Sequence, residues 1–203
     1  IGFNICKALA HCPVQHTIYL SSDAVYSSEI SEVTEETVAA PNDLYGIMHR
    51  AREIMFQSSV ASQSLAILRL TLTFGIADTH NAYGPNRFRR SAYQDKKITL
   101  FGEGQEMRDH IFVDDVVSVI VASLQHRSRG LLNVATGQSF SFMEVAKKVA
   151  VLFDYPVEIS SVAAKTSVKN RHYDVTLLHK TFPHMQWTII DRALLKVHQQ
   201  MME

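Results

Sequence analysis

Residues 21–26 (SSDAVY) and 45–49 (YGIMH) are the two short segments that decide the predicted fold. The run TIYL at 17–20 is apolar and β-branched and ends in small polar residues, which predicts a buried strand with Ser22 at its carboxyl end. Ligands bind at that edge of an open α/β sheet. We therefore expect Ser22 to face a binding site.

A helix is predicted over residues 44–60, with Tyr45 in its first turn and Asn42 or Asp43 as its cap. Apolar residues recur there at steps of three and four positions: Ile47, Met48, Ala51, Ile54 and Met55. A hydroxyl at a strand end and a phenol at a helix start are expected to converge on one substrate atom.

Both segments resemble the extended short-chain dehydrogenase/reductase family, the NAD(P)-dependent nucleotide-sugar epimerases, dehydratases and reductases. In this family the first segment follows the pattern S-[ST]-x-x-V-Y and the second follows Y-G-x-x-K. The resemblance implies that Ser22 orients the sugar oxygen, that Tyr45 exchanges its proton, and that NAD or NADP is the cofactor. His49 stands where the family has a Lys that lowers the Tyr pKa and holds the nicotinamide ribose. Ser21, Tyr45, His49 and Leu70 are the expected cofactor contacts.

The histidine at position 49 changes the expected chemistry. An ammonium one turn away favours phenolate, whereas a histidine is neutral much of the time near pH 7 and favours it less. Arg50 lies about 100° around the helix, and Arg52 shares the Tyr45 face two turns away. Two interpretations stay open: an enzyme with an altered site, and a non-catalytic member of the fold that binds nucleotide or a partner protein.

Asp23 and Ala24 bear on the type of reaction. In the dehydratase branch of the family the segment reads T-D-E-V-Y, and its Asp and Glu act as acid and base. Asp23 matches the acid, but Ala24 replaces the base and cannot accept a proton. This disfavours 4,6-dehydration and resembles the 4-keto-sugar reductases more, while epimerisation stays open. The alternative role for Asp23 is a turn or helix-cap carboxylate.

Residues 98–115 (ITLFGEGQEMRDHIFVDD) carry the second strong resemblance, to the family pattern I-x-[LV]-x-G-x-G-x-x-x-R-D. Arg108 matches the residue that clamps the nucleotide diphosphate of the substrate. Its alternative role is an ion pair with Asp109 or Asp114 that holds the loop.

Further substrate contacts are predicted on basic residues. One prediction is that Arg87, Arg89 and Arg90 bind a diphosphate, because guanidinium groups bind phosphate oxygens in a bidentate manner. The alternative is that the three arginines form an exposed basic face. Arg171 and Asp174 resemble the late family motif R-x-x-D, in which the Arg meets phosphate and the Asp the nucleotide ribose.

The other predicted elements are architectural. Asp114 or Asp115 is expected to cap a helix over 116–124, and Ser141 with Glu144 to form a capping box. The remaining predictions are a helix over 1–12, a buried strand over 65–75, strands over 98–101 and 131–137, a helix over 143–153, an edge strand over 157–162 and a closing helix over 188–202.

Composition restricts the functional classes. The 203 residues are 46% hydrophobic and 20% charged, with 20 basic and 20 acidic residues. Balanced charge gives no global attraction to nucleic acid, and no apolar run approaches the ~20 residues of a membrane span. Cys6 and Cys12 fit neither a metal site nor a disulfide framework, so we predict no metal and a reduced, cytoplasmic setting. The expected partners are a nucleotide-diphospho-sugar and a second copy in a homodimer.

The predicted fold class is α/β: part of a Rossmann-like doubly wound parallel sheet with a smaller α/β substrate-binding lobe. Residues 1–140 are expected to form the partial NAD(P)-binding domain with interleaved substrate-lobe segments, and 141–203 mainly the substrate lobe. No G-x-x-G-x-x-G turn follows a strand in these residues. From the resemblance, we expect the first third of the fold, which includes that turn, to lie upstream of Ile1.

Overall fold

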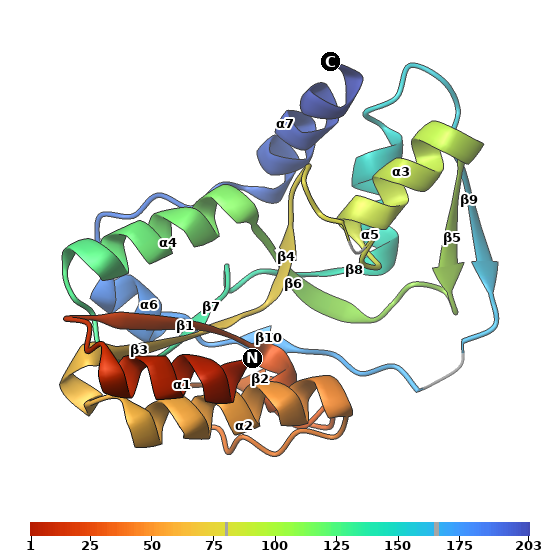
Figure 1. Cartoon of the computed structure of the whole chain (residues 1–203). Coiled ribbons are helices and arrows are strands. Elements are labelled where there is room, and N and C mark those ends of the chain that lie inside the picture. The colour runs from red at the N-terminus through yellow and green to blue at the C-terminus, as the bar shows by residue number, and fades with distance from the viewer. Residues whose placement is uncertain (80, 165–166) are drawn as a thin grey trace.

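Three parallel strands form the sheet that carries the predicted site (Figure 1). The computed structural model describes residues 1–79, 81–164 and 167–203. The strand order is β1 (Thr17–Ser22), β3 (Leu65–Leu70) and β7 (Gly130–Val134), with β3 in the centre. All but the last residue of β3 are buried, as expected for a parallel strand covered on both faces. The register places Ser22 beside Leu70 at the carboxyl edge.

Helices cover both faces of this sheet. In Figure 1, α1 (Gly2–His11) and α2 (Leu44–Ser59) lie on one face, and α4 (Val113–Gln125) and α6 (Thr176–Thr181) on the other. Asp43 caps α2, because its carboxylate accepts a hydrogen bond of 2.7 Å from the Gly46 amide. This confirms one of the two predicted caps and fixes where the Tyr45 turn begins.

A second lobe is built from β5 (Lys97–Phe101) and β9 (Glu158–Val162) with α3 (Pro85–Asp95), α5 (Phe142–Ala150) and α7 (Ile190–Met202). The two strands are parallel, and β9 pairs only with β5 among the described residues, as an edge strand should. The predicted capping box at the start of α5 is confirmed.

Short strands join the two lobes. One sheet has the order β4 (Leu72–Phe74), β6 (Met107–Phe112) and β8 (Ser139–Ser141). A second pairs β2 (Glu32–Val33) with β10 (His172–Tyr173), which brings the C-terminal region beside the segment that follows Ser22. Single 3-10 turns at Asp23–Val25 and Ser62–Ser64 complete the described elements.

Two predictions about these elements were wrong in detail. The strand predicted over 65–75 is divided at Thr71, and its halves join different sheets. Helix α4 begins at Val113 and has no side-chain cap bond. Asp115 instead accepts hydrogen bonds from the amide and hydroxyl of Thr188, and Asp114 pairs with Lys196.

The predicted class, α/β with parallel strands, is confirmed. Within the described ranges, no helix combines the length and apolar character that a bilayer crossing requires. The same part of the chain holds no group of three or more His, Cys, Asp or Glu side chains placed to bind a metal ion.

Candidate active site

Ser22 and Tyr45 line one cavity of about 570 Å³ at the carboxyl ends of β1 and β3. Ser22 is buried, and Tyr45 is 58% exposed on the first turn of α2. The glycine at position 46 allows this approach, since a Cβ there would lie 2.0 Å from the carbonyl oxygen of Ala24. The structure therefore brings the predicted hydroxyl and phenol to the same cavity.

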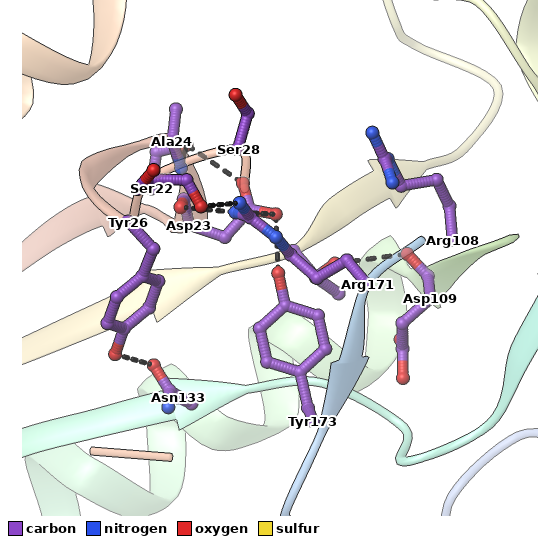
Figure 2. Close-up of polar contacts among 12 residues, drawn as sticks. Ser22, Asp23, Ala24, Tyr26, Ser28, Arg108, Asp109, Asn133, Arg171 and Tyr173 are labelled. Carbon is purple, nitrogen blue, oxygen red and sulfur yellow. Dashed lines mark hydrogen bonds and ion pairs between the residues drawn. The ribbon is translucent and has the colours of Figure 1, made fainter. Parts of the chain in front are cut away.

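The turn after Ser22 is held by local bonds. The Ser22 hydroxyl accepts a hydrogen bond of 3.2 Å from the Ala24 amide and donates one of 3.3 Å to Asp23. The other carboxylate oxygen of Asp23 accepts a bond of 2.6 Å from the Tyr173 hydroxyl (Figure 2). Burial and the Asp23 charge raise the pKa of Tyr173 well above its ordinary value, so it remains a donor. Asp23 is thus fixed at the cavity wall through both oxygens.

Arg171 is buried against the same turn. Its guanidinium donates to the carbonyl oxygens of Asp23 and Ser27 at 3.0 and 2.6 Å, as Figure 2 shows for Asp23. The guanidinium also lies 3.9 Å from the Asp23 carboxylate, so a role of Arg171 in binding phosphate falls to the N–H groups that these carbonyls do not engage. Asp174 lies just before α6, where its carboxylate accepts a bond from the Thr176 amide.

His49 contacts two tyrosines. Its Nδ1 lies 3.0 Å from the Tyr19 hydroxyl, and its ring meets the Tyr45 ring edge-on at 4.7 Å between centroids. Burial, and then the positive charge of Arg52, lower the pKa of His49 below its ordinary value of 6.5. Both effects favour the neutral form of the imidazole beside Tyr45.

Three of the four predicted cofactor contacts, Ser21, Tyr45 and Leu70, line the first cavity, whereas His49 lines a separate cavity of about 580 Å³ beside α1. The Ser21 hydroxyl is directed away from a ligand, because it donates a bond of 2.6 Å to Glu53. Leu70 contributes apolar wall at the end of β3.

A buried ionic network beneath the cavity was not predicted. Glu53 on α2 is fully buried and accepts two bonds from Arg69 of β3, at 2.9 and 2.8 Å, besides those from Ser21 and Arg50. The Arg69 guanidinium also lies over the Tyr26 ring, 4.8 Å from its centroid. The signal in the sequence was a single arginine in the apolar run LAILRL, which requires a buried carboxylate partner.

A smaller cavity of about 270 Å³ adjoins the first, and Tyr83 lines both. Arg87 lies 5.9 and 5.8 Å from the centroids of the Tyr83 and Phe101 rings. Arg108 pairs with Glu106 at 2.6 Å rather than with Asp109 or Asp114. The residues that line this cavity are Tyr83, Phe101, Gly102, Gln105, Glu106, Phe142, Ala164 and Val168.

The remaining two predicted arginines on α3 differ from each other. Arg90 pairs with Asp78 at 3.8 Å. Arg89 is 2% exposed, and its Nε and one terminal nitrogen have no hydrogen-bond partner among the described residues. Burial and the neighbouring charge of Arg90 lower the pKa of Arg89 to about 10. The three arginines therefore form neither a single exposed face nor a single anion grip.

A parallel sheet with a serine hydroxyl and a tyrosine phenol at its carboxyl edge defines an α/β protein of the Rossmann type. The chain belongs to the NAD dependent epimerase/dehydratase family, whose sequence profile matches residues 1–135. This confirms the resemblance from which the site was predicted.

Curated relatives include two enzymes of nucleotide-sugar metabolism. A dTDP-D-glucose 4,6-dehydratase from Dictyostelium discoideum is 27% identical over 153 residues, which are 65% of this chain and 34% of the relative. A dTDP-L-rhamnose 4-epimerase from Burkholderia thailandensis is 29% identical over 138 residues, 60% of this chain and 36% of the relative. The matches thus span about a third of these relatives' length.

Solved structures resemble nearly the whole chain. MoeE5 in complex with UDP-glucose and NAD matches with a TM-score of 0.87 and 21% identity, over 99% of this chain and 69% of that one. A UDP-N-acetylglucosamine 4-epimerase from Methanobrevibacter ruminantium, in complex with UDP-N-acetylmuramic acid, matches with a TM-score of 0.87 and 17% identity. The match covers 99% of this chain and 67% of that one. At these identities the likeness establishes the fold.

Proposed function

We propose that the chain carries the acid/base and substrate-orienting part of an NAD(P)-dependent nucleotide-sugar oxidoreductase. The observation that supports this most is the single cavity that Ser22 and Tyr45 share at the carboxyl edge of the sheet. Membership of the NAD dependent epimerase/dehydratase family supports the proposed reaction class, hydride transfer at a sugar carbon.

Tyr45 acts as the general acid/base in this proposal. As the phenolate it takes the proton of a sugar hydroxyl while the hydrogen on the same carbon leaves as hydride, which gives a carbonyl. In the reverse direction the phenol returns the proton to the carbonyl oxygen. Ser22 holds that oxygen, and this positioning is what makes the transfer efficient. Bound NAD(P) supplies the hydride acceptor and donor.

The first cavity suits the nicotinamide end of the cofactor and the sugar. Its wall is apolar at Leu70, Leu72 and Phe74, and polar at Ser22 and Tyr45. Tyr45, which lines this cavity, and His49, which lines a separate cavity of about 580 Å³ beside α1, would contact the nicotinamide ribose. The chain has no glycine-rich turn after a strand to receive the pyrophosphate.

The second cavity suits the nucleoside of the substrate. Aromatic rings line it and provide stacking surfaces for a base, and Tyr83 lines both cavities. Arg87 and Arg108 border it, and their guanidinium groups match phosphate oxygens in charge and geometry. A nucleotide diphosphate between these arginines would place its sugar in the first cavity. MoeE5, a structural relative, is described in complex with UDP-glucose and NAD.

Two reactions within this class fit the site. Ala24 offers no side-chain base, and its amide is bound to Ser22, so dehydration is disfavoured. Epimerisation regenerates its cofactor, whereas a 4-keto-sugar reductase consumes NAD(P)H with each turnover. Net consumption of NAD(P)H with a 4-keto-sugar nucleotide would identify the reductase.

A non-catalytic role is the second candidate, and the histidine at position 49 favours it. Position 49 carries an imidazole in place of the ammonium that would stabilise a phenolate at Tyr45, and this imidazole is hydrogen-bonded to Tyr19. The variant His49→Lys separates the two functions. A large gain in turnover identifies an enzyme with an altered site, and no gain points to a binding subunit.

The test measures thermal stabilisation of the protein by NAD(H), NADP(H) and a panel of UDP-, GDP- and dTDP-sugars. A ligand at 100 times its dissociation constant adds about 2.7 kcal/mol to the free energy of unfolding. We expect a shift with one sugar nucleotide, and we expect Tyr45→Phe to keep that shift while it abolishes turnover. The control is Tyr93→Phe, at an exposed tyrosine on α3. No shift with any ligand would overturn the proposal.

A further inference from the structure

Two buried side chains of the C-terminal segment contact the turn that follows Ser22. Strand β10 pairs in parallel with β2, so this segment runs beside the residues that lead away from the turn (Figure 1). Alternate residues of an extended chain face the same side. Arg171 and Tyr173 are 7% and 6% exposed, and both contact Asp23 (Figure 2). One side of the segment therefore carries both side chains to the same residue of the turn.

The Arg171 guanidinium holds the backbone at both ends of the turn. One terminal nitrogen donates to the carbonyl of Asp23 at 3.0 Å, and the other donates to that of Ser27 at 2.6 Å. The same two carbonyls accept from the amides of Tyr26 and Ile30, at 3.0 and 3.2 Å. The cation thus joins two consecutive turns, and the Asp23 carboxylate lies 3.9 Å from it. Both terminal nitrogens of Arg171 are engaged within the protein.

Arg87 and Arg108, the arginines proposed to meet the diphosphate, are more accessible than Arg171. Arg87 is exposed, and the side chain of Arg108 is 21% exposed, against 8% for that of Arg171. A phosphate at Arg171 would also meet the Asp23 carboxylate, whose like charge repels it. The contacts of Arg171 therefore favour a role at the turn over a role in phosphate binding.

Tyr173 fixes the side chain of Asp23 next to the Ser22 hydroxyl. The Tyr173 hydroxyl donates to one carboxylate oxygen at 2.6 Å, and the Ser22 hydroxyl donates to the other at 3.3 Å. Hydrogen bonds between oxygens are usually about 2.7–2.8 Å long, so the first bond is strong and the second is weak. Ser22 and Asp23 both line the first cavity. The Ser22 proton is therefore oriented, but it is held weakly enough to be donated to a ligand oxygen in that cavity.

We propose that Arg171 and Tyr173 are positioning residues of the active site, which hold the backbone and carboxylate of Asp23 and thereby set the direction of the Ser22 hydroxyl. Arg171 then supports the acid/base end of the site and does not make the phosphate contact predicted for it. This inference rests on the proposed function, because it assigns both side chains to the orientation of Ser22.

Amide hydrogen exchange tests this hold on the turn without any cofactor or substrate. The Ala24 amide donates to the Ser22 hydroxyl oxygen and reports whether that bond is formed. Tyr173→Phe keeps the ring but frees the Asp23 carboxylate, so we expect exchange at Ala24 to become about fivefold faster, as for the loss of one hydrogen bond. Tyr93→Phe, at an exposed tyrosine of α3, should leave that rate unchanged. No acceleration at Ala24, or an equal acceleration throughout β3, would overturn the inference.

Nucleotide binding separates a positioning role of Arg171 from a phosphate contact. Isothermal titration calorimetry with UDP, GDP and dTDP identifies the diphosphate that binds. We expect Arg171→Met to keep its dissociation constant within about twofold, whereas Arg108→Gln, which removes a charged donor, should weaken binding roughly tenfold or more. Arg129→Met, at an exposed site, is the matched control and should bind as the wild type does. A tenfold loss of affinity in Arg171→Met would overturn the inference.

Turnover distinguishes this inference from the proposed function. If Tyr45→Phe abolishes turnover, Tyr173→Phe should lower kcat several-fold with little change in KM, because the freed carboxylate draws the Ser22 hydroxyl away from the sugar oxygen. An unchanged kcat would refute the role of Tyr173. If no nucleotide binds and Tyr45→Phe has no effect on turnover, the proposed function fails, and the exchange rate at Ala24 still decides whether Tyr173 holds the turn.

Discussion

Replacement of Glu53 by Gln should destabilise the fold far more than the loss of an ordinary surface charge. Four donors meet its carboxylate, and the side chain is fully buried. The isosteric amide keeps the volume but leaves the Arg69 guanidinium without its counter-charge, at 4% exposure. Removal of one partner from a buried pair typically costs about 3–5 kcal/mol, because the other charge remains buried.

Urea denaturation at pH 7 measures this cost. With an m-value of about 2 kcal/mol/M, the midpoint of Glu53→Gln should fall by roughly 2 M while m stays constant. The control is Glu158→Gln, which breaks an exposed pair with Lys97 and should change stability by no more than about 1 kcal/mol. Equal midpoints for the two variants would refute the reasoning.

The pH dependence gives a second check on Glu53. Burial raises its pKa, but the bonds from Arg69 and Ser21 outweigh that effect and hold the pKa below its ordinary value of 4.5. A carboxyl with a lowered pKa in the folded state stabilises the protein above its unfolded pKa, and this contribution is lost as pH falls through the folded pKa. The difference in free energy of unfolding between the wild-type protein and Glu53→Gln should therefore become smaller below about pH 4.5.

Two further predictions concern buried charges. Arg89→Met should raise the free energy of unfolding by about 1–3 kcal/mol, since it removes a buried guanidinium of which two nitrogens have no hydrogen-bond partner among the described residues. Arg129→Met, at an exposed site, should not. Burial raises the pKa of Asp109 to about 6, so the contribution of Asp109 to the stability of the wild-type protein should fall by on the order of 3 kcal/mol as pH rises from about 4 to 6. Asp109→Asn should lack that slope, and a parallel pH profile would contradict the assignment.

Sequence patterns predicted those elements whose structure depends on contacts between residues that are close together in the chain. The strand that ends at Ser22, the α2 start capped by Asp43 and the capping box of Ser141 all depend on residues within a few positions of one another. The division of residues 65–75 could not be predicted in this way. Thr71 donates its amide to Val134 and its hydroxyl to Asp109, and both acceptors lie far along the chain.

The same distinction applies to the candidate site. Ser22, Tyr45 and His49 were predicted because each belongs to a short motif, but their partners come from distant segments. Tyr173 reaches Asp23 across 150 positions, and Tyr19 reaches His49 across 30. A motif therefore predicts which groups belong to the candidate site, while the environment and orientation of those groups are set by contacts that only the folded chain creates. In this protein those contacts bond Asp23 through both carboxylate oxygens and lower the pKa of His49, and position 49 is where the candidate site departs from its family motif.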